Sequence, residues 1–365
     1  MADRIRVGLV GVGSWGRYGH IPALRLLPEY EIVAVSSRRP DTATALALEF
    51  GIRHAFADFQ YLVEHPDVDL VVVLPPAPEH ARIVKGAIAA GKDVYCEWPL
   101  TASTAQSEEI LELAEKAGVR HCVGLQRTVG ASSLQFRKLI DSHFAGDLRS
   151  IRMHVSMNGF GPIRSKSLEW TLPSANFSHV LSIYGGHFMD MLFHAVGMPA
   201  TIGALVRTPF AEVSVEAGPR VLNETPDAVM MMGTLQNGAL YQVQIEGGNL
   251  YPRGLLIELT GTQGDLEVSN ERAFVTEHHD LIRGVSGSGQ WKEINIEERF
   301  HTIPPCTLDA SVQDLAQLYA AFAQDRLTGT KSTRDFRDAV TMHRLIDVIL
   351  DASSLNKTIA FKETV

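Results

Sequence analysis

The sequence predicts an α/β protein in which a doubly wound parallel sheet is followed by an α+β region built on a large, mostly antiparallel open sheet. Over residues 1–126, short apolar runs alternate with helical segments, which is the order of a doubly wound fold. From residue 127 onward, strands with period-two alternation dominate, and helices return only near the C-terminus. The length of 365 residues also favours two domains over one.

Apolar runs and turn signals define the elements of the first region. The five expected strands are Ile5–Val10, Glu31–Ser36, Asp69–Leu74, Asp93–Glu97 and Val119–Leu125. Continuous apolar runs of this kind are typical of strands buried on both faces of a parallel sheet. The intervening helices are expected to end at Leu27, to cover Asp41–Phe50 and Glu79–Ala90, and to begin at the capping box Ser103–Gln106.

The second region alternates polar and apolar residues, as half-buried strands do. In residues 151–157 the apolar side chains share one face and the polar ones share the other. The segments Ala228–Leu235 and Ala239–Ile245 flank Asn237-Gly238, which predicts a hairpin with a type I′ turn. The remaining expected elements are strands at 255–260 and 265–268 and helices at 132–144, 311–323 and 332–352.

Composition narrows the classes of function. The formal net charge is −9, which argues against nonspecific nucleic-acid binding because phosphate attraction needs a basic surface. The three cysteines form no CxxC pair, and their odd number does not suggest a disulfide framework. The N-terminus has no signal-peptide pattern, and the apolar run that ends at Pro75-Pro76 is too short to span a bilayer. We therefore expect a cytoplasmic protein with no membrane or nucleic-acid partner.

A glycine-rich loop directly follows the first expected strand. Residues Gly11-Val12-Gly13-Ser14-Trp15-Gly16 fit the pattern GxGxxG between a strand and a helix. Gly11 permits a tight turn, Gly13 lets the backbone approach a pyrophosphate, and Gly16 lets the helix pack on the strand. That helix offers free N–H groups and the positive end of its dipole to phosphates. The first region is therefore predicted to be a Rossmann domain that binds a nicotinamide dinucleotide, with Ser14 and Trp15 among the contact residues.

The end of the second strand indicates which dinucleotide is bound. Enzymes that use NAD usually carry an acidic residue there, which accepts a hydrogen bond from the ribose. This chain has Ser36-Ser37-Arg38-Arg39 instead. The hydroxyl of Ser37 and the guanidinium groups of Arg38 and Arg39 suit a 2′-phosphate, so NADP is favoured and NAD stays an alternative. The other interpretation is that both arginines are solvated loop charges.

Motifs spread over nearly the whole chain resemble those of the Gfo/Idh/MocA family of sugar and polyol oxidoreductases. They are the glycine loop with His20 and Pro22, the segments Leu74–His80 and Gly91–Leu100, the stretch Gly185–Asp190 with His194, and the helix around Asp338–Arg344. The resemblance implies that the cofactor site is also lined by Pro75, His80, Glu97 and Gln126. It further implies a homodimer or a dimer of dimers.

One motif departs from the family. Typical members have Glu-Lys-Pro where this chain has Glu97-Trp98-Pro99, and the family lysine helps to move the proton of the substrate hydroxyl. An indole N–H donates a hydrogen bond but is no base at neutral pH, so we expect Trp98 to stack near the nicotinamide or on a sugar. With Gly124-Leu125-Gln126, this motif resembles the branch that contains the fungal galactose-regulon repressor, in which the fold binds a dinucleotide and regulates through protein contacts.

An aspartate and a histidine stand four residues apart on an expected helix. Asp190 and His194 therefore share one face of that helix. The resemblance implies that His194 acts as acid or base and that Asp190 holds a substrate hydroxyl, and histidine suits this work because its ordinary pKa lies near neutrality. His187 and Tyr184 are expected to reach the same substrate pocket. The alternative is a packing face on which His194 is simply hydrogen-bonded.

Together these features predict an NADP-dependent oxidoreductase that acts on a carbohydrate, a polyol or a related carbonyl compound. Residues 1–126 would bind the dinucleotide, and residues 127–365 would bind the small-molecule substrate and form the dimer interface. A second hypothesis is a non-catalytic dinucleotide-binding regulator, which Trp98 favours. A third is a lyase or hydrolase that oxidises its substrate transiently with a tightly held cofactor. No metal site is expected, because Glu277–Asp280 is interpreted as an exposed turn.

Overall fold

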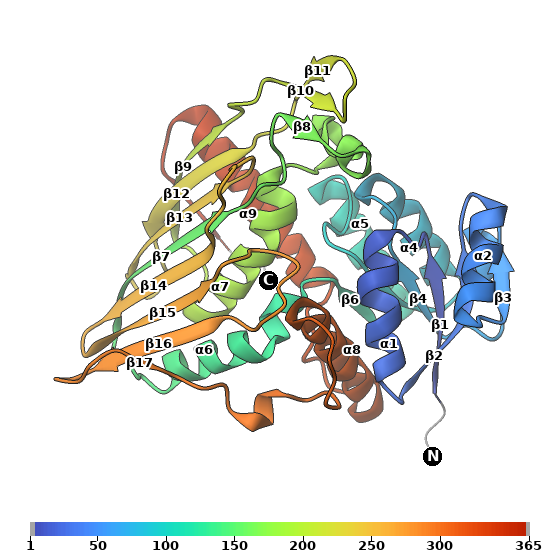
Figure 1. Ribbon diagram of the computed structural model, residues 1–365, viewed down its shortest axis with the longest axis horizontal. Coiled ribbons are helices and arrows are strands. Elements are labelled where there is room, and N and C mark those ends of the chain that lie inside the picture. The colour runs from blue at the N-terminus through green and yellow to red at the C-terminus, as the bar shows by residue number, and fades with distance from the viewer. Residues whose placement is uncertain (1–3, 363–365) are drawn as a thin grey trace. The chain divides into compact units, whose positions relative to one another are not determined.

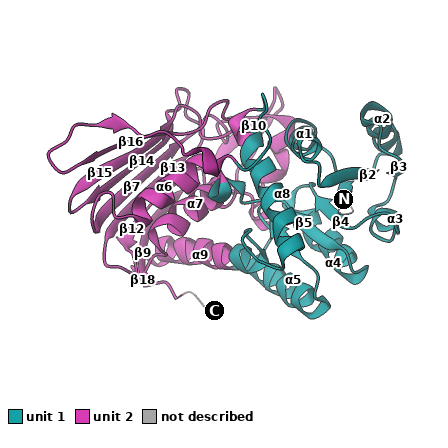
Figure 2. Cartoon of the chain, turned by 90° about the horizontal axis from the view of Figure 1, so that it is seen from below, with its two compact units in different colours: residues 1–129, 302–308, 312–340 teal, residues 130–301, 309–311, 341–365 magenta. Residues whose placement is uncertain are grey.

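The computed structural model describes residues 4–362, which form two compact units. Unit 1 comprises the chain up to residue 129 together with 302–308 and 312–340, and unit 2 comprises residues 130–301, 309–311 and the chain from 341 on (Figure 2). Two segments near the C-terminus thus return to unit 1, which the order of strands and helices along the chain does not signal. Among the described residues, no helix is long and apolar enough to cross a membrane.

Unit 1 is built on a six-stranded parallel sheet (Figure 1). Its strands lie in the order β3 (His54–Phe56), β2 (Tyr30–Ser36), β1 (Ile5–Val10), β4 (Leu70–Val73), β5 (Asp93–Cys96) and β6 (His121–Val123). This order is that of the Rossmann fold, and it reverses direction between β1 and β4, where such folds bind ligands. Every residue of β4 is buried, as its continuous apolar run predicted. The short strand β3 has no buried residue, which explains why its sequence carried no strand signal.

Most helices of unit 1 lie where the local sequence predicts them, although α3 was not predicted and α8 extends beyond the expected residue 323. They are α1 (Ile21–Leu26), α2 (Pro40–Phe50), α3 (Phe59–Val63), α4 (His80–Ala89), α5 (Thr104–Ala117) and most of α8 (Ala310–Thr328). At the start of α5, the hydroxyl of Ser103 accepts a hydrogen bond from the backbone N–H of Gln106 at 3.3 Å. The helix ends at Gly118, which has a φ of 67°. In α8, Leu315 and Tyr319 belong to the same buried cluster as the apolar residues of β1.

Unit 2 is built on a nine-stranded sheet. Its strands lie in the order β17 (Lys292–Glu293), β16 (Leu281–Ser286), β15 (Gly264–Asn270), β14 (Gly254–Gly261), β7 (Leu148–Ser156), β13 (Leu240–Glu246), β12 (Ala228–Thr234), β9 (Thr201–Arg207) and β18 (Ile359–Ala360). Neighbours pair antiparallel except β7 and β13, which run parallel. The predicted α/β fold class, with a large and mostly antiparallel second sheet, is therefore confirmed. A smaller sheet is formed by β8 (Ile163–Arg164), β10 (Glu212–Val215) and β11 (Arg220–Leu222).

The two faces of the large sheet differ. Figure 1 shows α6 (Ala131–Asp141) and α7 (Gly186–Val196) along one face, and Ile151, Met153 and Val155 of β7 are buried. The last helix, α9 (Phe336–Leu355), begins in unit 1 and ends in unit 2. Alternate residues of the central strands stay exposed, including the large apolar side chains Leu205, Met230, Met232 and Leu240. The sheet thus has one covered face and one open face with apolar side chains on it.

The hairpin between β12 and β13 forms as predicted, but its turn differs from the predicted type I′. The strands end at Thr234 and begin again at Leu240, so residues 235–239 make the connection. The N–H of Gly238 donates to the carbonyl of Leu235 at 2.9 Å, and Gly238 has a φ of 86°. Because Asn237 does not share this positive φ, the connection is a wider turn closed by a left-handed glycine. The extra residues allow that geometry, since the chain need not reverse within two positions.

Candidate functional site: a dinucleotide cavity and a polar helix

The glycine loop leaves β1 at Gly11, and each of its glycines has a different structural role. Gly11 has a φ of 77°, and a Cβ there would lie 2.4 Å from Cγ of Pro75. A Cβ on Gly13 would meet nothing within 4 Å, so the backbone there is open to an approaching ligand. A Cβ on Gly16 would lie 2.9 Å from Cγ1 of Val12, so its absence keeps the helix close to the preceding loop. This arrangement fits a bound pyrophosphate.

The residues between the glycines point in different directions. Ser14 is exposed at the start of the helix, whereas Trp15 turns inward. The Trp15 ring lies 2.8 Å from where a Cβ on Gly19 would be, and its centroid is 5.9 Å from that of His20. Neither Ser14 nor Trp15 lines the cavity next to the loop. Trp15 therefore contributes to helix packing in this structure, and its predicted cofactor contact stays a prediction.

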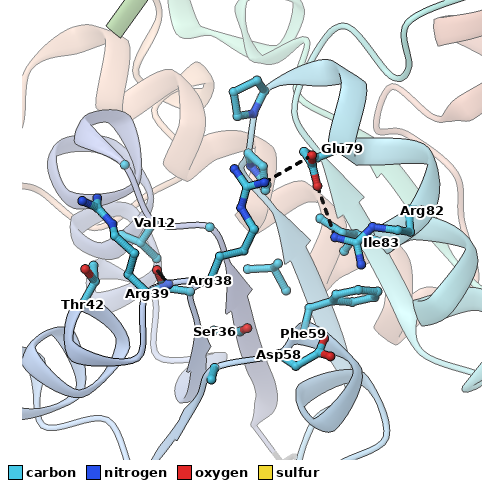
Figure 3. Close-up of a pocket in the computed structure, with 17 residues that line it drawn as sticks. Val12, Ser36, Arg38, Arg39, Thr42, Asp58, Phe59, Glu79, Arg82 and Ile83 are labelled. Carbon is cyan, nitrogen blue, oxygen red and sulfur yellow. Dashed lines mark hydrogen bonds and ion pairs between the residues drawn. The ribbon is translucent and has the colours of Figure 1, made fainter. Parts of the chain in front are cut away.

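A cavity of about 650 Å³ lies at the C-terminal ends of β1, β2 and β4 in unit 1 (Figure 3). The residues expected at the cofactor that line it are Gly11, Gly13, Ser37, Arg38, Arg39 and Pro75. Open α/β sheets bind ligands at this edge of the sheet. Sequence reasoning missed further lining residues, among them Thr42, Asp58, Phe59 and Arg82. Those residues follow the weak strand β3 or lie inside helices, where no motif marks them.

Charged side chains surround the mouth of this cavity. Nη1 of Arg38 lies 3.5 Å from Oε1 of Glu79, and Nη2 of Arg82 lies 3.2 Å from Oε2 of the same carboxylate (Figure 3). The Arg38 side chain is 81% exposed, so it is free to turn toward a ligand. The backbone N–H of Arg39 donates to the hydroxyl of Ser37 at 3.3 Å. Three guanidinium groups, of Arg38, Arg39 and Arg82, against the two carboxylates of Asp58 and Glu79 leave the cavity lining with a small positive balance.

His80 joins the loops that follow β4 and β5. Its Nδ1 lies 2.9 Å from the carbonyl oxygen of Pro99, and its Nε2 lies 2.6 Å from that of Pro75. Burial lowers the pKa of His80, and the contacts with the two carbonyl oxygens oppose this effect. Because both ring nitrogens face backbone carbonyls and His80 does not line the cavity, its contribution here is to hold Pro75 in place. A direct contact of His80 with the cofactor stays a prediction.

Glu97 lies in a buried polar cluster that links three parts of the chain. The hydroxyl of Tyr95 donates to Oε1 of Glu97 at 2.8 Å, and Nε2 of His20 lies 3.1 Å from the same oxygen. Nδ1 of His20 lies 2.7 Å from the hydroxyl of Tyr319 on α8. Burial raises the pKa of Tyr95 and of Tyr319, so both phenols keep their protons. His20 therefore contacts the Tyr319 hydroxyl through Nδ1 and lies within ion-pair distance of Glu97 through Nε2.

Two other expected site residues of unit 1 are buried. Trp98 is 5% exposed, and its peptide bond to Pro99 is cis. Gln126 is 7% exposed and lies in a short turn after β6. Neither residue lines the cavity of the glycine loop. The indole thus occupies a packed position just after β5.

Unit 2 brings the predicted acid/base pair onto α7. Asp190 is 1% exposed, and His194 lies one turn further along the same helix, half-buried. Nε2 of His194 contacts the guanidinium of Arg137 on α6, a partner that the sequence did not indicate. Because a guanidinium can only donate, Nε2 of His194 is the acceptor in this contact. Lys166, in the irregular segment after β8, pairs with Glu169 at 2.5 Å.

Tyr184 and His187 stand at the start of α7 among aromatic rings. The ring centroid of Tyr184 is 5.2 Å from that of Phe160 and 4.6 Å from that of Phe274. His187 is 6% exposed, and its ring centroid lies 5.3 Å from that of Phe274. Burial raises the pKa of Tyr184. These side chains form a compact aromatic cluster, and their predicted contact with substrate stays a prediction.

One group of potential metal ligands occurs within residues 4–362, away from the glycine loop. Nε2 of His54 lies 3.4 Å from Oδ2 of Asp67, and His65 is close by. Nδ1 of His65, however, accepts a hydrogen bond from the backbone N–H of Asp67 at 3.2 Å. A neutral ring that accepts through Nδ1 carries its proton on Nε2, which removes the lone pair that a metal needs. We therefore assign no metal to this group.

Two family models match this chain, one in its N-terminal part and one in its C-terminal part. Residues 5–125 match the model of an oxidoreductase family with an NAD-binding Rossmann fold, described as GFO_IDH_MocA. Residues 132–270 match the model of the Gal80p C-terminal domain. The resemblance found in the motifs, including the similarity to the branch of the galactose repressor, is confirmed by these two matches.

Both a dehydrogenase and a galactose regulatory protein are among the relatives of this chain. Dehydrogenase aclE of Aspergillus oryzae is 25% identical over 99% of this chain and 100% of its own length. The galactose/lactose metabolism regulatory protein GAL80 of Kluyveromyces lactis is 26% identical over 74% of this chain and 65% of its own length. Among solved structures, levoglucosan dehydrogenase in complex with NADH and L-sorbose superimposes with a TM-score of 0.85, at 19% identity and over 99% of this chain and 100% of that one. This last likeness shows the fold.

Proposed function

We propose that this chain is an NAD(P)-dependent oxidoreductase acting on a carbohydrate, polyol or related carbonyl compound. The proposal proceeds from the two family matches. Residues 5–125 belong to the oxidoreductase family with the NAD-binding Rossmann fold, and residues 132–270 belong to the family of the Gal80p C-terminal domain. The observation that carries the proposal is the cavity of about 650 Å³ beside an open Gly13. Dehydrogenase aclE, a relative over the whole chain, supports the choice of a redox enzyme. Levoglucosan dehydrogenase with its bound sugar supports the substrate class.

Residues of unit 1 would hold the dinucleotide. The open backbone at Gly13 would take the pyrophosphate, and Ser37, Arg38 and Arg39 would take the adenosine ribose with its 2′-phosphate. This arrangement favours NADP over NAD, because no carboxylate stands at the end of β2 to bind a free ribose hydroxyl. When bound, the nicotinamide supplies the acceptor or donor of a hydride.

Residues on α7 would handle the proton and the substrate hydroxyls. We assign the proton to His194 and the orientation of a hydroxyl to Asp190, with Tyr184 and His187 as substrate contacts. With Nε2 of His194 facing Arg137, the neutral ring carries its proton on Nδ1, the atom from which a proton can be donated. Trp98 cannot replace the family lysine as a base, so His194 is the group left to move the proton.

A regulator without catalysis is the second candidate function, and two observations favour it. Trp98 is packed at the position where the family resemblance implies a lysine, and Nε2 of His194 is already in contact with Arg137. In this reading the cofactor-bound state would be reported to a protein partner. The C-terminal domain of the Gal80p type fits either candidate.

The test follows absorbance of reduced nicotinamide while the purified chain meets NADP⁺ or NAD⁺ and a panel of sugars, polyols and lactones. We expect steady reduction with one substrate, loss of that rate in His194→Ala, and no loss in His143→Ala, an exposed histidine of the same unit. Cofactor binding without reduction by any member of the panel would contradict the oxidoreductase and favour the regulator. A single turnover with no net redox change would point to transient oxidation.

The outer face of the large sheet supports a homodimer. Leu205, Met230, Met232 and Leu240 expose apolar side chains on β9, β12 and β13. Exposed apolar patches of this kind mark protein interfaces. We propose that a second copy of the chain covers this face, and light scattering on the purified protein tests it.

A further inference from the structure

Unit 2 contains a buried arginine, Arg164, for which the described residues supply no ion-pair partner within 4 Å. Arg164 on β8 is 1% exposed, and both of its terminal nitrogens, Nη1 and Nη2, are closed off from solvent without a hydrogen-bond partner in residues 4–362. A guanidinium is always protonated at neutral pH and presents its donors as a planar fork. Burying such a fork without acceptors is costly, so a position of this kind calls for an anion.

The guanidinium is held in place from the other side. Nε of Arg164 donates to the carbonyl oxygen of Gly161 at 3.1 Å, and the guanidinium carbon lies 4.7 Å from the centroid of the Phe160 ring. Phe160 has a φ of 66°, a strained value for a residue with a side chain, and such strain collects at binding sites. The backbone of Arg164 is fixed as well, because it pairs with Val215 of β10. The fork is therefore ordered before any ligand arrives.

Asp227, the carboxylate that interacts electrostatically with Arg164, does not form an ion pair with it. Asp227 is buried, and its Oδ2 accepts from the backbone N–H of Phe210 at 3.2 Å and from Nδ2 of Asn223 at 3.4 Å. No ion pair within 4 Å joins Asp227 to Arg164 in the described part of the chain, and burial raises the pKa of Asp227 to about 6. Burial also lowers the pKa of Arg164, which Asp227 and Tyr184 oppose. The two terminal nitrogens thus stay available.

Aromatic contacts link this position to the start of α7. Phe160, which lies under Arg164, contacts Tyr184, and Tyr184 contacts Phe274. Phe274 in turn contacts His187, one turn before Asp190. Arg164 therefore stands beside the residues to which we assign substrate contacts.

We propose that Arg164 binds an anionic oxygen group of the substrate, a carboxylate or a phosphate, so that the enzyme acts on a charged sugar derivative. The inference rests on the proposed function for the sugar-like part of the ligand. Two parallel N–H donors match the geometry of either group. Because both nitrogens are closed off from solvent, the protein around Arg164 must move to admit the anion.

Calorimetric titration of the full-length protein tests the inference with three probes of one sugar frame. D-Glucuronate carries a carboxylate, D-glucose 6-phosphate carries a phosphate, and D-glucuronamide replaces the carboxylate by a neutral amide of the same shape. We expect one of the two anionic probes to bind about tenfold more tightly than the amide, since hydrogen bonds to a charged group are about twice as strong as neutral ones. Which anion binds identifies the group, and equal binding of all three or binding of none overturns the proposal.

Variants locate the effect. Arg164→Gln should abolish the preference for the anionic probe, and Arg164→Lys should keep part of it. Arg152→Gln on β7, where the side chain is 62% exposed, is the matched control and should change nothing. If Arg164→Gln does not fold, the comparison of acid and amide on the unmodified protein still decides. An intact preference in a folded Arg164→Gln variant contradicts the assignment.

The two proposals fail separately, because calorimetry needs no turnover. A preference for an anion without reduction of NADP⁺ by any substrate would keep the anion site and remove the oxidoreductase. Reduction of NADP⁺ by neutral sugars with no preference for an anion would do the reverse.

Discussion

Replacing Arg38 and Arg39 by alanine should weaken the binding of NADP⁺ and leave the binding of NAD⁺ unchanged. Both arginines line the cavity at the end of β2, as does Ser37. The two dinucleotides differ only in the 2′-phosphate. Any selective loss therefore measures the contact of the guanidinium groups with that phosphate.

The expected loss of NADP⁺ binding free energy depends on how exposed the arginine side chains are. A charge-assisted hydrogen bond in a buried site contributes roughly 1.5–3 kcal/mol. The Arg38 side chain is 81% exposed, so solvent screening reduces its share to about 1 kcal/mol. One substitution should then raise the dissociation constant for NADP⁺ about fivefold, and the double variant about thirtyfold. The effect should shrink with added salt, as it does for exposed charges.

Calorimetry or quenching of tryptophan fluorescence gives both dissociation constants. Arg53→Ala, a half-exposed arginine of unit 1 that pairs with Glu31, is the matched control. Glu79→Gln should act in the opposite direction, because it frees Arg38 from its ion pair and should tighten NADP⁺ binding a few-fold. An equal loss for NADP⁺ and NAD⁺, or no loss in the double variant, would refute the assignment of these arginines to the 2′-phosphate.

Three further results are expected. Gly13→Ala should abolish dinucleotide binding and leave the melting temperature unchanged, because the new Cβ would meet no protein atom. Gly11→Ala should lower the melting temperature as well, because the Cβ at this position would meet Pro75 and the φ of Gly11 is positive. Met232→Glu should convert a dimer to a monomer in light scattering, and an unchanged mass would exclude this face as the interface. Burial lowers the pKa of His343 to about 3, which is below its value in the unfolded chain. The neutral His343 therefore contributes fully to the free energy of unfolding above about pH 6.5. This contribution is lost as the pH falls toward 3, by about 1.4 kcal/mol per pH unit. His343→Phe should therefore lose less stability between pH 7 and 4.5 than the unmodified protein in urea denaturation, and parallel losses would contradict this origin.

Much of unit 1 could be predicted because its signals are local. The apolar run of β4, the hydroxyl of Ser103 and the glycines of the loop each act within a few residues of their own position. The same holds for Arg38 and Arg39, which follow β2 directly and so reach the end of the sheet whatever the rest of the chain does. Predictions failed where a local rule admits more than one geometry, as at the turn before Gly238.

The partners of the site residues could not be predicted, because they come from distant segments. Glu97 meets His20, which in turn meets Tyr319 on a helix that returns to unit 1 from the far end of the chain. Likewise, Arg137 reaches His194 only because α6 packs against α7. No periodicity or motif encodes such pairs, since each residue alone is an ordinary member of its own element.

The sequence by itself determined the alternation of strands and helices in the first region, the Rossmann loop with its open glycine, and the presence of Asp190 and His194 on one helix face. Only the tertiary structure decided what those groups contact. It gave His194 a guanidinium partner, packed Trp98 out of solvent, and left the fork of Arg164 buried without an acceptor. The physical reason is that secondary structure depends on nearest neighbours along the chain, whereas burial, charge pairing and pKa shifts depend on neighbours in space.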